Sequence, residues 1–390
     1  MSAMIRRIPI ELTSTTSTLL VGRGLLGSLA AHLGAEGILV PGRGVLVASD
    51  VNVRETHGAA CIRALESAGA RVTPLVLEAR EDRKAMRAVE AVWSAALASR
   101  LDRSALFVAV GGGLVGDLVG FAAATYLRGV ELVQVPTSLL AMVDAAIGGK
   151  TGVNLILPDG TLGKNLAGAM HQPKATIADP ACLTTLPDRE YRAGLAECVK
   201  HALIDGEAAF AALEIDAPAL AARDAEAIDR LVPRSAAIKA AVVGRDPFEQ
   251  GDRMTLNLGH TFGHAFETAE GMELLHGEAV AIGLCAAARC AGASGHLEAG
   301  AGAGTGSATA LERRLEMLLY TLGLPRTLPV PASAASIRGR MGFDKKAAHG
   351  RLRLVLPRAI GRVEVATVEP GSALDRAIDT ALVAVGCRPA

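Results

Sequence analysis

The sequence predicts an α/β domain with a Rossmann-like parallel sheet, followed by a mainly α-helical C-terminal domain. Apolar, strand-like runs alternate with helix-like runs through the first half of the chain, a pattern typical of parallel sheets covered by helices. Beyond about residue 179 the strand signals fade, and stretches rich in Ala, Leu and Glu dominate. A chain of 390 residues is long enough for two well-packed domains. We therefore expect an α/β domain at 1–178 and a helical domain at 179–390.

The composition is that of a globular protein and excludes several other classes. Hydrophobic residues make up 50% of the chain and charged residues 21%, which argues against disorder. Lys plus Arg and Asp plus Glu number 40 each, so the chain lacks the basic excess of a nucleic-acid-binding protein. Any local cluster of positive charge would then point to small anions such as phosphates.

The cysteines and the N-terminus point to a cytoplasmic protein. Six cysteines are scattered without a C-x-x-C pair, which argues against a zinc ribbon or a disulfide framework and favours a reducing compartment. The first residues, M-S-A-M-I-R-R-I-P-I-E-L, lack the continuous apolar core of a signal peptide. The longest apolar run, near residues 279–288, is too short to span a bilayer. We expect a soluble protein that binds neither nucleic acid nor a membrane.

The first half of the chain supplies the strands of the expected sheet. The expected strands span residues 44–49, 71–77, 105–110 and 131–135, and the expected helices span 56–69, 81–101 and 116–126. In such a sheet, ligands bind beyond the carboxyl ends of the strands. Asp50 and the triple glycine at 111–113 both fall at such ends.

The segment 111–117, G-G-G-L-V-G-D, contains the pattern G-x-G-x-x-G. It follows an expected strand and opens an expected helix, the context in which glycines let the backbone approach a pyrophosphate. In a standard Rossmann unit the pattern follows the first strand, and an acidic residue comes about 20 residues later. Here the glycines come late, and the best ribose-binding acid, Asp50, lies upstream. The segment therefore predicts a nucleotide site of a different layout; the alternative is a tight turn that requires glycine.

A second glycine-containing segment, 138–165, carries charged side chains suited to phosphate. Asp144, Lys150, Lys164 and Asn165 lie in or beside its two glycine-containing turns. Lysines combined with backbone amides in such turns form a phosphate cradle. Isolated lysines usually belong to surface loops, but the repeated G-K pairing leaves the two interpretations evenly matched.

The second half of the chain is expected to be helical, with a small hairpin near its end. Helices are expected at 188–213 and 224–243, and the hairpin is expected to pair 351–356 with 361–365. The run 295–308, rich in Gly and Ala, is expected to be a flexible surface loop without chemistry.

Three of the nine histidines lie in the stretch 253–276, R-M-T-L-N-L-G-H-T-F-G-H-A-F-E-T-A-E-G-M-E-L-L-H. His260 and His264 would share one face of a helix whose N-terminus is capped by Asn257 or a nearby Thr. His276 follows a glycine at which that helix could stop. Imidazoles gathered near a helix start suggest a divalent metal such as zinc, completed by a carboxylate. A pair of histidines four residues apart is, however, usually incidental.

The segment 194–200, G-L-A-E-C-V-K, is a candidate source of that carboxylate. Glu197 and Lys200 lie on one face of an expected helix. Either they form an ordinary exposed ion pair, or Glu197 is the missing oxygen ligand of the metal. The spacing alone leaves both interpretations open.

Taken together, these segments resemble the 3-dehydroquinate synthase family, within the group of sugar phosphate cyclases. The motifs that carry the resemblance are G-G-G-x-x-G-D, Y-L-R-G-V, V-P-T-S-L-L, D-A-A-I-G-G-K-T-G-V-N, L-G-K-N-L, T-L-P-D-R-E, G-L-A-E-C-V-K and L-N-L-G-H-T-F-G-H-A. Their order and spacing match the family along nearly the whole chain, from Asp50 to the pair Lys345 and Lys346. The chain departs from the family in a longer segment at 155–162.

The resemblance implies an N-terminal NAD-binding α/β domain, a helical C-terminal domain and catalysis in the cleft between them. By position, the metal ligands would be Glu197, His260 and His276, and the metal would be zinc or cobalt. His264 would then be a catalytic hydrogen-bonding group rather than a ligand. The NAD-binding set would comprise Asp50, Glu81, Lys84, Gly112, Gly113, Asp117, Thr137, Ser138, Lys164, Thr185, Leu186 and Glu190.

The family's substrate is 3-deoxy-D-arabino-heptulosonate 7-phosphate, and the resemblance gives the remaining polar residues a task. Arg253 and Lys239 would bind its carboxylate, and Asp144 and Lys200 its ring hydroxyls. The phosphate would be surrounded by Lys150, Asn165, Asn257, one of Lys345 and Lys346, and Arg128 from the second subunit of a homodimer. The residues expected to take part in catalysis are Lys150, Lys200, His264, Asp144 and Asn257.

The implied activity is that of a lyase of the shikimate pathway of aromatic amino acid biosynthesis. NAD would oxidise the hydroxyl at carbon 5, phosphate would leave by β-elimination, and the ketone would be reduced back. The ring would then open, and an intramolecular aldol step would close the carbocycle. The metal would chelate the hydroxyls at carbons 4 and 5 as a Lewis acid. NAD would be regenerated in each turnover and would act as a catalytic cofactor.

Four alternatives differ from this activity in the groups that they would need. A sibling cyclase acting on glucose 6-phosphate or sedoheptulose 7-phosphate has no carboxylate to bind, so Arg253 and Lys239 argue against it. An aminodehydroquinate synthase keeps the carboxylate and stays open. A metal-dependent polyol dehydrogenase of the same broad fold would not need so many phosphate-directed cations, and a non-catalytic NAD-binding regulator would not need an intact set of metal ligands.

Overall fold

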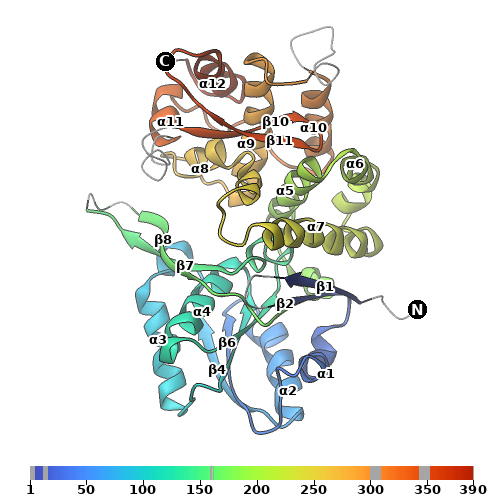
Figure 1. The fold of residues 1–390 in the computed structure, drawn as a ribbon, viewed down its shortest axis with the longest axis vertical. Helices are drawn as coiled ribbons and strands as arrows, with labels where there is room; N and C mark the ends of the chain where they lie inside the picture. Colours follow the sequence, from blue (N-terminus) through green and yellow to red (C-terminus); the bar gives the residue numbers. More distant parts are fainter. Residues whose placement is uncertain are drawn as a thin grey trace. The chain divides into compact units, whose positions relative to one another are not determined.

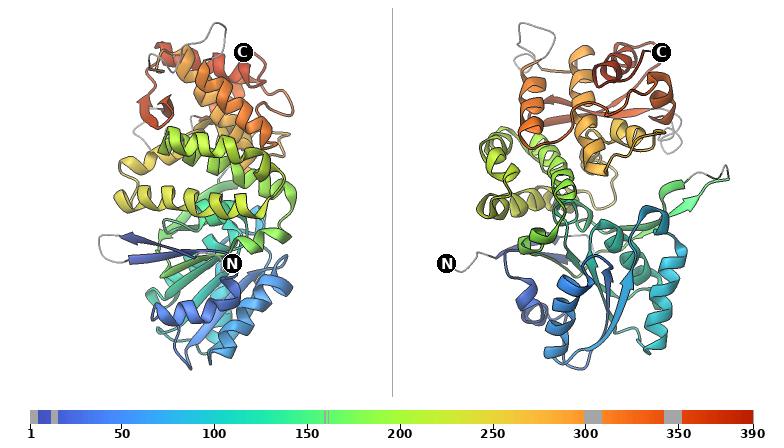
Figure 2. Two further views of the ribbon diagram at one scale, coloured as in Figure 1. Left: turned by 90° about the vertical axis from the view of Figure 1, so that its right-hand side faces the viewer. Right: turned by 180° about the vertical axis from the view of Figure 1, so that it is seen from behind.

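The computed structural model describes residues 5–11, 16–158, 160, 162–298, 309–341 and 352–389. The chain divides into two units, which are drawn in Figures 1 and 2. The first unit comprises Met1–Pro187 and Val232–Pro247, and the second comprises Asp188–Leu231 and Phe248–Ala390. Lys345, Lys346 and most of the expected loop at 295–308 lie outside the described residues.

The first unit is built, within its described residues, on a seven-stranded sheet with the order β1-β2-β9-β6-β5-β3-β4. Neighbouring strands are parallel except for β1 and β2, so the predicted parallel sheet is confirmed. Strands β3 and β5 are buried along their whole length, which explains their continuous apolar runs. The strands span Arg6–Glu11 (β1), Thr16–Val21 (β2), Gly44–Asp50 (β3), Arg71–Leu77 (β4), Leu106–Gly111 (β5), Glu131–Pro136 (β6) and Ala175–Ala178 (β9).

Three of these strands carry no clear signal in the sequence. Strand β1 is mostly exposed, β2 opens with the polar residues T-S-T, and β9 is only four residues long. Strand β9 is nevertheless fully buried between β2 and β6. The expected strands therefore account for the centre and one edge of the sheet and leave out the other edge.

Helices lie on both faces of this sheet, with α1 (Leu29–Ala35) and α2 (Ala59–Ser67) opposite α3 (Met86–Ala98) and α4 (Gly113–Thr125) in Figure 1. The core beneath α3 and α4 contains Val92, Phe107, Leu118 and their neighbours. These helices bury apolar side chains against the sheet, as expected for β-α-β units.

The expected helix at 81–101 is wrong in its first turn. Glu81–Arg83 form a separate 3-10 turn (η3), and Lys84 has a non-helical ψ of 69° before α3 begins at Met86. Local helix propensity favoured a continuous helix, but the segment makes hydrogen bonds to a distant strand that a helix could not make. Tertiary hydrogen bonds therefore override the local helix propensity of this segment.

An antiparallel hairpin, β7 (Lys150–Ile156) and β8 (Leu162–Met170), occupies the segment in which the sequence predicted only glycine-containing turns (Figure 1). A bulge interrupts its ladder between Val153 and Leu155. Most of β8 is exposed or half-buried, so the hairpin lacks the apolar alternation by which strands are recognised.

The second unit is mainly helical and ends in a small antiparallel hairpin, as the sequence predicted. The expected helix at 188–213 is two helices, because the chain turns at Gly206 with a φ of 141°. Helix α7 continues into the first unit from Val232 onward. The elements span Asp188–Asp205 (α5), Glu207–Ala221 (α6), Ala225–Arg245 (α7), His260–Glu267 (α8), His276–Ala293 (α9), Ala310–Thr321 (α10), Ala334–Met341 (α11), Arg353–Ala359 (β10), Arg362–Thr367 (β11) and Ala373–Ala384 (α12).

Helix α9 is buried along almost its whole length and packs against α5, α8 and α12. Two glycines allow a close approach of backbones. A Cβ atom at Gly277 would lie 1.8 Å from the carbonyl oxygen of Ala193 on α5, and one at Gly283 would lie 2.1 Å from the carbonyl oxygen of Gly259. The start of α9 therefore lies against α5, and Gly259, the residue before α8, lies against the middle of α9. Within the described residues, every helix is too short or too polar to span a bilayer.

Candidate active site

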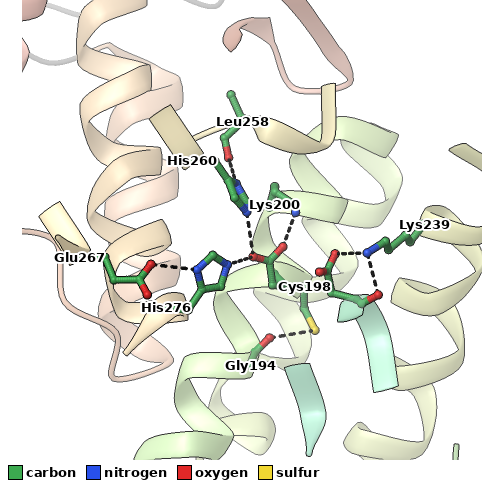
Figure 3. Close-up of polar contacts among 10 residues, drawn as sticks. Gly194, Cys198, Lys200, Lys239, Leu258, His260, Glu267 and His276 are labelled. Carbon is green, nitrogen blue, oxygen red and sulfur yellow. Dashed lines mark hydrogen bonds and ion pairs between the residues drawn. The ribbon is translucent and has the colours of Figure 1, made fainter. Parts of the chain in front are cut away.

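Three helices of the second unit bring Glu197, His260 and His276 together. Figure 3 shows His260 and His276 with the polar contacts around them. Glu197 lies in the middle of α5, and the two histidines are the first residues of α8 and α9. The Nε2 atom of each histidine is 3.5 Å from Oε1 of Glu197, and one ligand atom from each residue lies within 4.8 Å of the others. One carboxylate oxygen and two imidazole nitrogens are the donors of a catalytic zinc site with three protein ligands. The donors therefore fit a divalent metal such as zinc or cobalt.

Each imidazole of this cluster is held through its other ring nitrogen. Nδ1 of His260 lies 3.2 Å from the carbonyl oxygen of Leu258, and Nδ1 of His276 lies 3.2 Å from Oε2 of Glu267. With the proton on Nδ1, the Nε2 lone pair of each imidazole would be available to a metal ion in the cluster, and such oxygen partners are usual behind ligating histidines. Glu267 was not singled out in the sequence, although it lies two turns after His260 on the same helix face.

The two carboxylate oxygens of Glu197 face different partners. Oε1 faces the imidazoles, whereas Oε2 forms an ion pair with Lys200. The side chains of Lys200 and Glu197 are buried, with exposed fractions of 1% and 0%. The interpretation of this pair as an exposed ion pair is therefore wrong.

The electrostatics of the cluster favour a cation. Burial, followed by the charge of Lys200, lowers the pKa of His260 well below its usual value, so that this imidazole is neutral at pH 7. Burial also lowers the pKa of His276, but the hydrogen bonds and charges of Glu197 and Glu267 outweigh burial and raise this pKa to about 10. In the metal-free chain, a proton on His276 thus balances the carboxylates. A bound divalent ion would take over that role and release the proton.

His264 lies one turn beyond His260 and is exposed. Its ring centroid is 5.3 Å from that of His260 and 5.8 Å from that of His276. The expected helix cap is wrong: Gly259, with a φ of 79°, precedes α8 and provides no side-chain cap. Asn257 instead donates from Nδ2 to Oε1 of Glu249 at 2.9 Å.

In the first unit, the ends of three neighbouring strands form the candidate nucleotide site. Asp50 ends β3, Gly111 ends β5, and Ser138 follows β6. A Cβ atom at Gly111 would lie 3.4 Å from Cβ of Asp50, and one at Gly112 would lie 3.6 Å from Oγ of Ser138. Helix α4 begins directly after Gly112, so its N-terminal amides lie at this edge of the sheet. The structure therefore brings the predicted acid and the predicted glycines together.

A buried lysine connects further candidate residues of this unit. Nζ of Lys84 contacts Oδ2 of Asp117 on α4 and Oδ1 of Asn165 on β8. Nδ2 of Asn154, a residue that sequence reasoning missed, donates to Oε2 of Glu81 at 2.8 Å. The only signal for Asn154 was its place in the motif D-A-A-I-G-G-K-T-G-V-N.

The remaining candidate residues are distributed over both units. Nζ of Lys239 donates to the carbonyl oxygen and to Oδ1 of Asp144, at 2.6 and 2.7 Å, within the first unit. In the second unit, Arg253 is buried, with an exposed fraction of 2%. Lys150 at the start of β7, Glu190 in α5 and Arg128 are exposed. The hydroxyl of Thr185 is hydrogen-bonded to His57. The other candidates are Gly113 at the start of α4, Thr137 after β6, Lys164 on β8, and Leu186, which follows Thr185.

Models of one family cover most of the chain. A model described as 3-dehydroquinate synthase N-terminal matches residues 74–193, and a model described as 3-dehydroquinate synthase C-terminal matches residues 194–347. The two models meet inside α5, three residues before Glu197.

One relative that carries the family's name and two solved structures of other synthases are similar to nearly the whole chain. The 3-dehydroquinate synthase of Gloeobacter violaceus is 44% identical over 376 residues, covering 96% of this chain and 99% of the relative. The structure of 2-epi-5-epi-valiolone synthase from Streptomyces hygroscopicus subsp. jinggangensis, with NAD+ and Zn2+ bound, is similar with a TM-score of 0.81 and 29% identity, covering 96% and 98% of the two chains. A 2-deoxy-scyllo-inosose synthase complexed with carbaglucose-6-phosphate, NAD+ and Co2+ shares the fold with a TM-score of 0.78 and 23% identity, covering 96% and 99%.

Proposed function

Since the chain belongs to the 3-dehydroquinate synthase family, we propose that it converts 3-deoxy-D-arabino-heptulosonate 7-phosphate to 3-dehydroquinate and phosphate. The reaction makes it a lyase, with NAD and a divalent metal, zinc or cobalt, as cofactors. The observation that carries the proposal is the convergence of Glu197, His260 and His276 in the second unit. The NAD+ and Zn2+ of the similar valiolone synthase support the same pair of cofactors.

Glu197, His260 and His276 would hold the metal, which when bound polarises substrate hydroxyls as a Lewis acid. We assign Lys200 to a ring hydroxyl, because its ammonium group is buried beside the metal-binding carboxylate. We assign proton transfer to His264, an exposed imidazole close to the cluster.

The cations of the chain are assigned to the two anionic groups of the substrate. Arg253 stays charged even when buried, and with Lys239 it binds the carboxylate. Lys150, Asn165 and Asn257 bind the phosphate, together with one of Lys345 and Lys346. Asp144, the partner of Lys239, binds a ring hydroxyl.

NAD is assigned to the carboxyl edge of the sheet in the first unit. Asp50 accepts hydrogen bonds from the ribose, while the amides near Gly112 and Gly113 face the pyrophosphate. Lys84 and Asp117 form an ion pair that orients the cofactor. The other residues assigned to NAD are Glu81, Thr137, Ser138, Lys164, Thr185, Leu186 and Glu190.

We further infer a homodimer in which Arg128 reaches the phosphate of the neighbouring subunit. Leu127 and Arg128 have φ values of 49° and 71°. These are consecutive left-handed backbone conformations, which residues other than glycine adopt at a cost in free energy. This turn exposes Arg128 at the surface of the first unit.

We also infer a cytoplasmic location. The six cysteines are all buried free thiols, as is usual in a reducing compartment.

The proposal is tested by phosphate release from candidate sugar phosphates, assayed side by side. We expect release from the heptulosonate phosphate to require both NAD and a divalent metal, without net accumulation of NADH. Glucose 6-phosphate and sedoheptulose 7-phosphate, which lack the carboxylate, are expected to be poor substrates. Net formation of NADH from a polyol, without phosphate release, would instead identify a dehydrogenase, and release from only the amino analogue would identify an aminodehydroquinate synthase.

A further inference from the structure

The bulge in the β7–β8 hairpin gives one residue, Asn154, an unusual position. Val153 pairs with Ala167 and Leu155 pairs with Gly163, so Asn154 stands alone opposite residues 164–166. A bulge bends the strand and re-aims side chains that a regular ladder would direct elsewhere. The bulged strand is the one that carries Lys164 and Asn165, and Asn165 has a left-handed φ of 55°.

The side chain of Asn154 is buried and makes hydrogen bonds in two directions. Nδ2 donates to Oε2 of Glu81 at 2.8 Å and to the carbonyl oxygen of Glu81 at 3.0 Å. Oδ1 accepts a hydrogen bond from the amide of Asn165 at 2.8 Å. The amide of Asn154 itself donates to the carbonyl oxygen of Lys84 at 2.7 Å. The exposed fraction of the residue is 3%.

These bonds close a ring of contacts in the first unit. Asn154 holds Asn165 and the turn that contains Glu81 and Lys84, and Lys84 in turn contacts Oδ1 of Asn165. Only an amide side chain supplies two N–H donors and one acceptor at this place. An aspartate would lose the donors and face the carboxylate of Glu81, and an apolar side chain would leave buried polar groups unpaired.

We propose that Asn154 is a positioning residue that couples the cofactor-binding turn to the phosphate-binding residue. One side chain fixes Glu81 and Lys84, assigned above to NAD, and also Asn165, assigned above to the substrate phosphate. The identity of the two ligands rests on the proposed function. Ordering of either segment by its ligand then orders the other, so NAD and phosphate bind more tightly together than apart.

The test is titration of the full-length, metal-loaded chain with NAD, in the absence and presence of inorganic phosphate. We expect Asn154→Leu to weaken NAD binding by roughly tenfold and to abolish the gain in NAD affinity that phosphate produces. Ile156→Ala, a change at an exposed position of the same strand, is the matched control and is expected to behave like the wild type.

Two further variants, which exchange donor and acceptor groups at residues 154 and 81, distinguish a positioning role from a general loss of structure. Asn154→Asp keeps the acceptor for the amide of Asn165 but removes the donors to Glu81, and it is expected to weaken NAD binding several-fold. Glu81→Gln returns a donor to that contact, so Asn154→Asp is expected to cost less NAD affinity in the Glu81→Gln background than in the wild type; the direct effect of Glu81 on NAD is present in both members of that comparison and cancels. This comparison does not involve Asn154→Leu, so it can be made even if that variant fails to fold.

The outcomes are distinct. A wild-type chain that binds NAD, together with an Asn154→Leu variant that binds it equally well and keeps the response to phosphate, overturns the inference alone. An equal cost of Asn154→Asp in the wild-type and Glu81→Gln backgrounds also overturns it. A wild-type chain that binds no NAD overturns the proposed function, and with it the assignment of ligands on which this inference rests.

Discussion

The two units provide their functional groups in different ways. In the first unit, candidate ligands such as Asp50 and the glycines at 111–113 stand at the ends of neighbouring parallel strands, so the backbone of the sheet positions them. In the second unit, three side chains from three helices converge, and two of them, Glu197 and His260, are buried. The first site therefore depends mainly on backbone geometry, whereas the second depends on buried charges that must balance. We expect the second to be far more sensitive to the loss of a single charge.

Removal of Lys200 is expected to have the largest effect. Lys200→Met leaves the carboxylate of Glu197 buried without its ammonium partner, which costs about 3–5 kcal/mol of the free energy of unfolding in the metal-free chain. Urea-induced unfolding measures this loss, and added metal is expected to reverse part of it. Arg192→Met removes an exposed partner of Asp188 on the same helix and is the matched control, with an expected cost below about 0.5 kcal/mol.

The equivalent change in the first unit is Asp117→Asn, which removes the ionic partner of Lys84. Asp117 is 24% exposed and Lys84 keeps its contact with Asn165, so we expect a smaller cost of about 1–2 kcal/mol. If this variant and Lys200→Met lost equal stability, the contrast between the two units would be mistaken.

Loss of the carboxylate behind His276 is expected to act on the metal rather than on NAD. Glu267→Gln removes the charge that orients Nδ1 of His276, and we expect roughly tenfold weaker metal binding with unchanged NAD binding. Competition with a chelator measures the metal affinity. Glu270→Gln, at an exposed neighbouring position, should leave it unchanged; a similar loss in both variants would argue against a specific role of Glu267.

The pH dependence of stability is expected to differ between histidines of the two units. In the metal-free chain the pKa of His276 is raised from 6.5 to about 10, so its stabilising contribution is complete below pH 6.5 and is lost as the pH rises through 10. In the first unit, burial lowers the pKa of His171, so its contribution is present above pH 6.5 and is lost on acidification. Unfolding of His276→Gln and His171→Gln across this range should flatten opposite limbs of the profile. A flattened acid limb in His276→Gln would contradict the assignment.

The smallest expected effect on stability is at the turn that exposes Arg128. Arg128→Gly relieves a left-handed conformation and is expected to stabilise the chain by about 1 kcal/mol. The same variant is expected to raise KM for the sugar phosphate, because the guanidinium is lost. Arg128→Lys retains a charge without relieving the backbone and is the control; a raised KM with unchanged stability in Arg128→Gly would exclude strain at this turn.

The sequence predicted the parts of the fold whose signals are local. Strands β3, β5 and β6 were found because their apolar runs are buried on both faces, and the glycines of 111–113 marked the end of β5. The hairpin β7–β8 was missed because its exposed, glycine-containing strands lack alternation. The start of α3 was misplaced because it depends on hydrogen bonds from Asn154, far along the chain.

Prediction of the metal cluster had a different limit. The spacing of His260 and His264 suggested a metal, but the meeting of three helices is not a local property. The set of Glu197, His260 and His276 came from the resemblance to a family, and burial of Lys200 beside Glu197 was not foreseen at all. Partners such as Glu267 and Asn154 emerge only when the helices and strands are packed.

We propose that Glu197, His260 and His276 hold one divalent ion and that NAD binding by the first unit does not require it. Parallel measurement of bound metal and of NAD affinity in the wild type and in His276→Ala tests it most directly. We expect stoichiometric metal in the wild type, loss of that metal in the variant, and equal NAD affinity in both. Unchanged metal content in His276→Ala would contradict it.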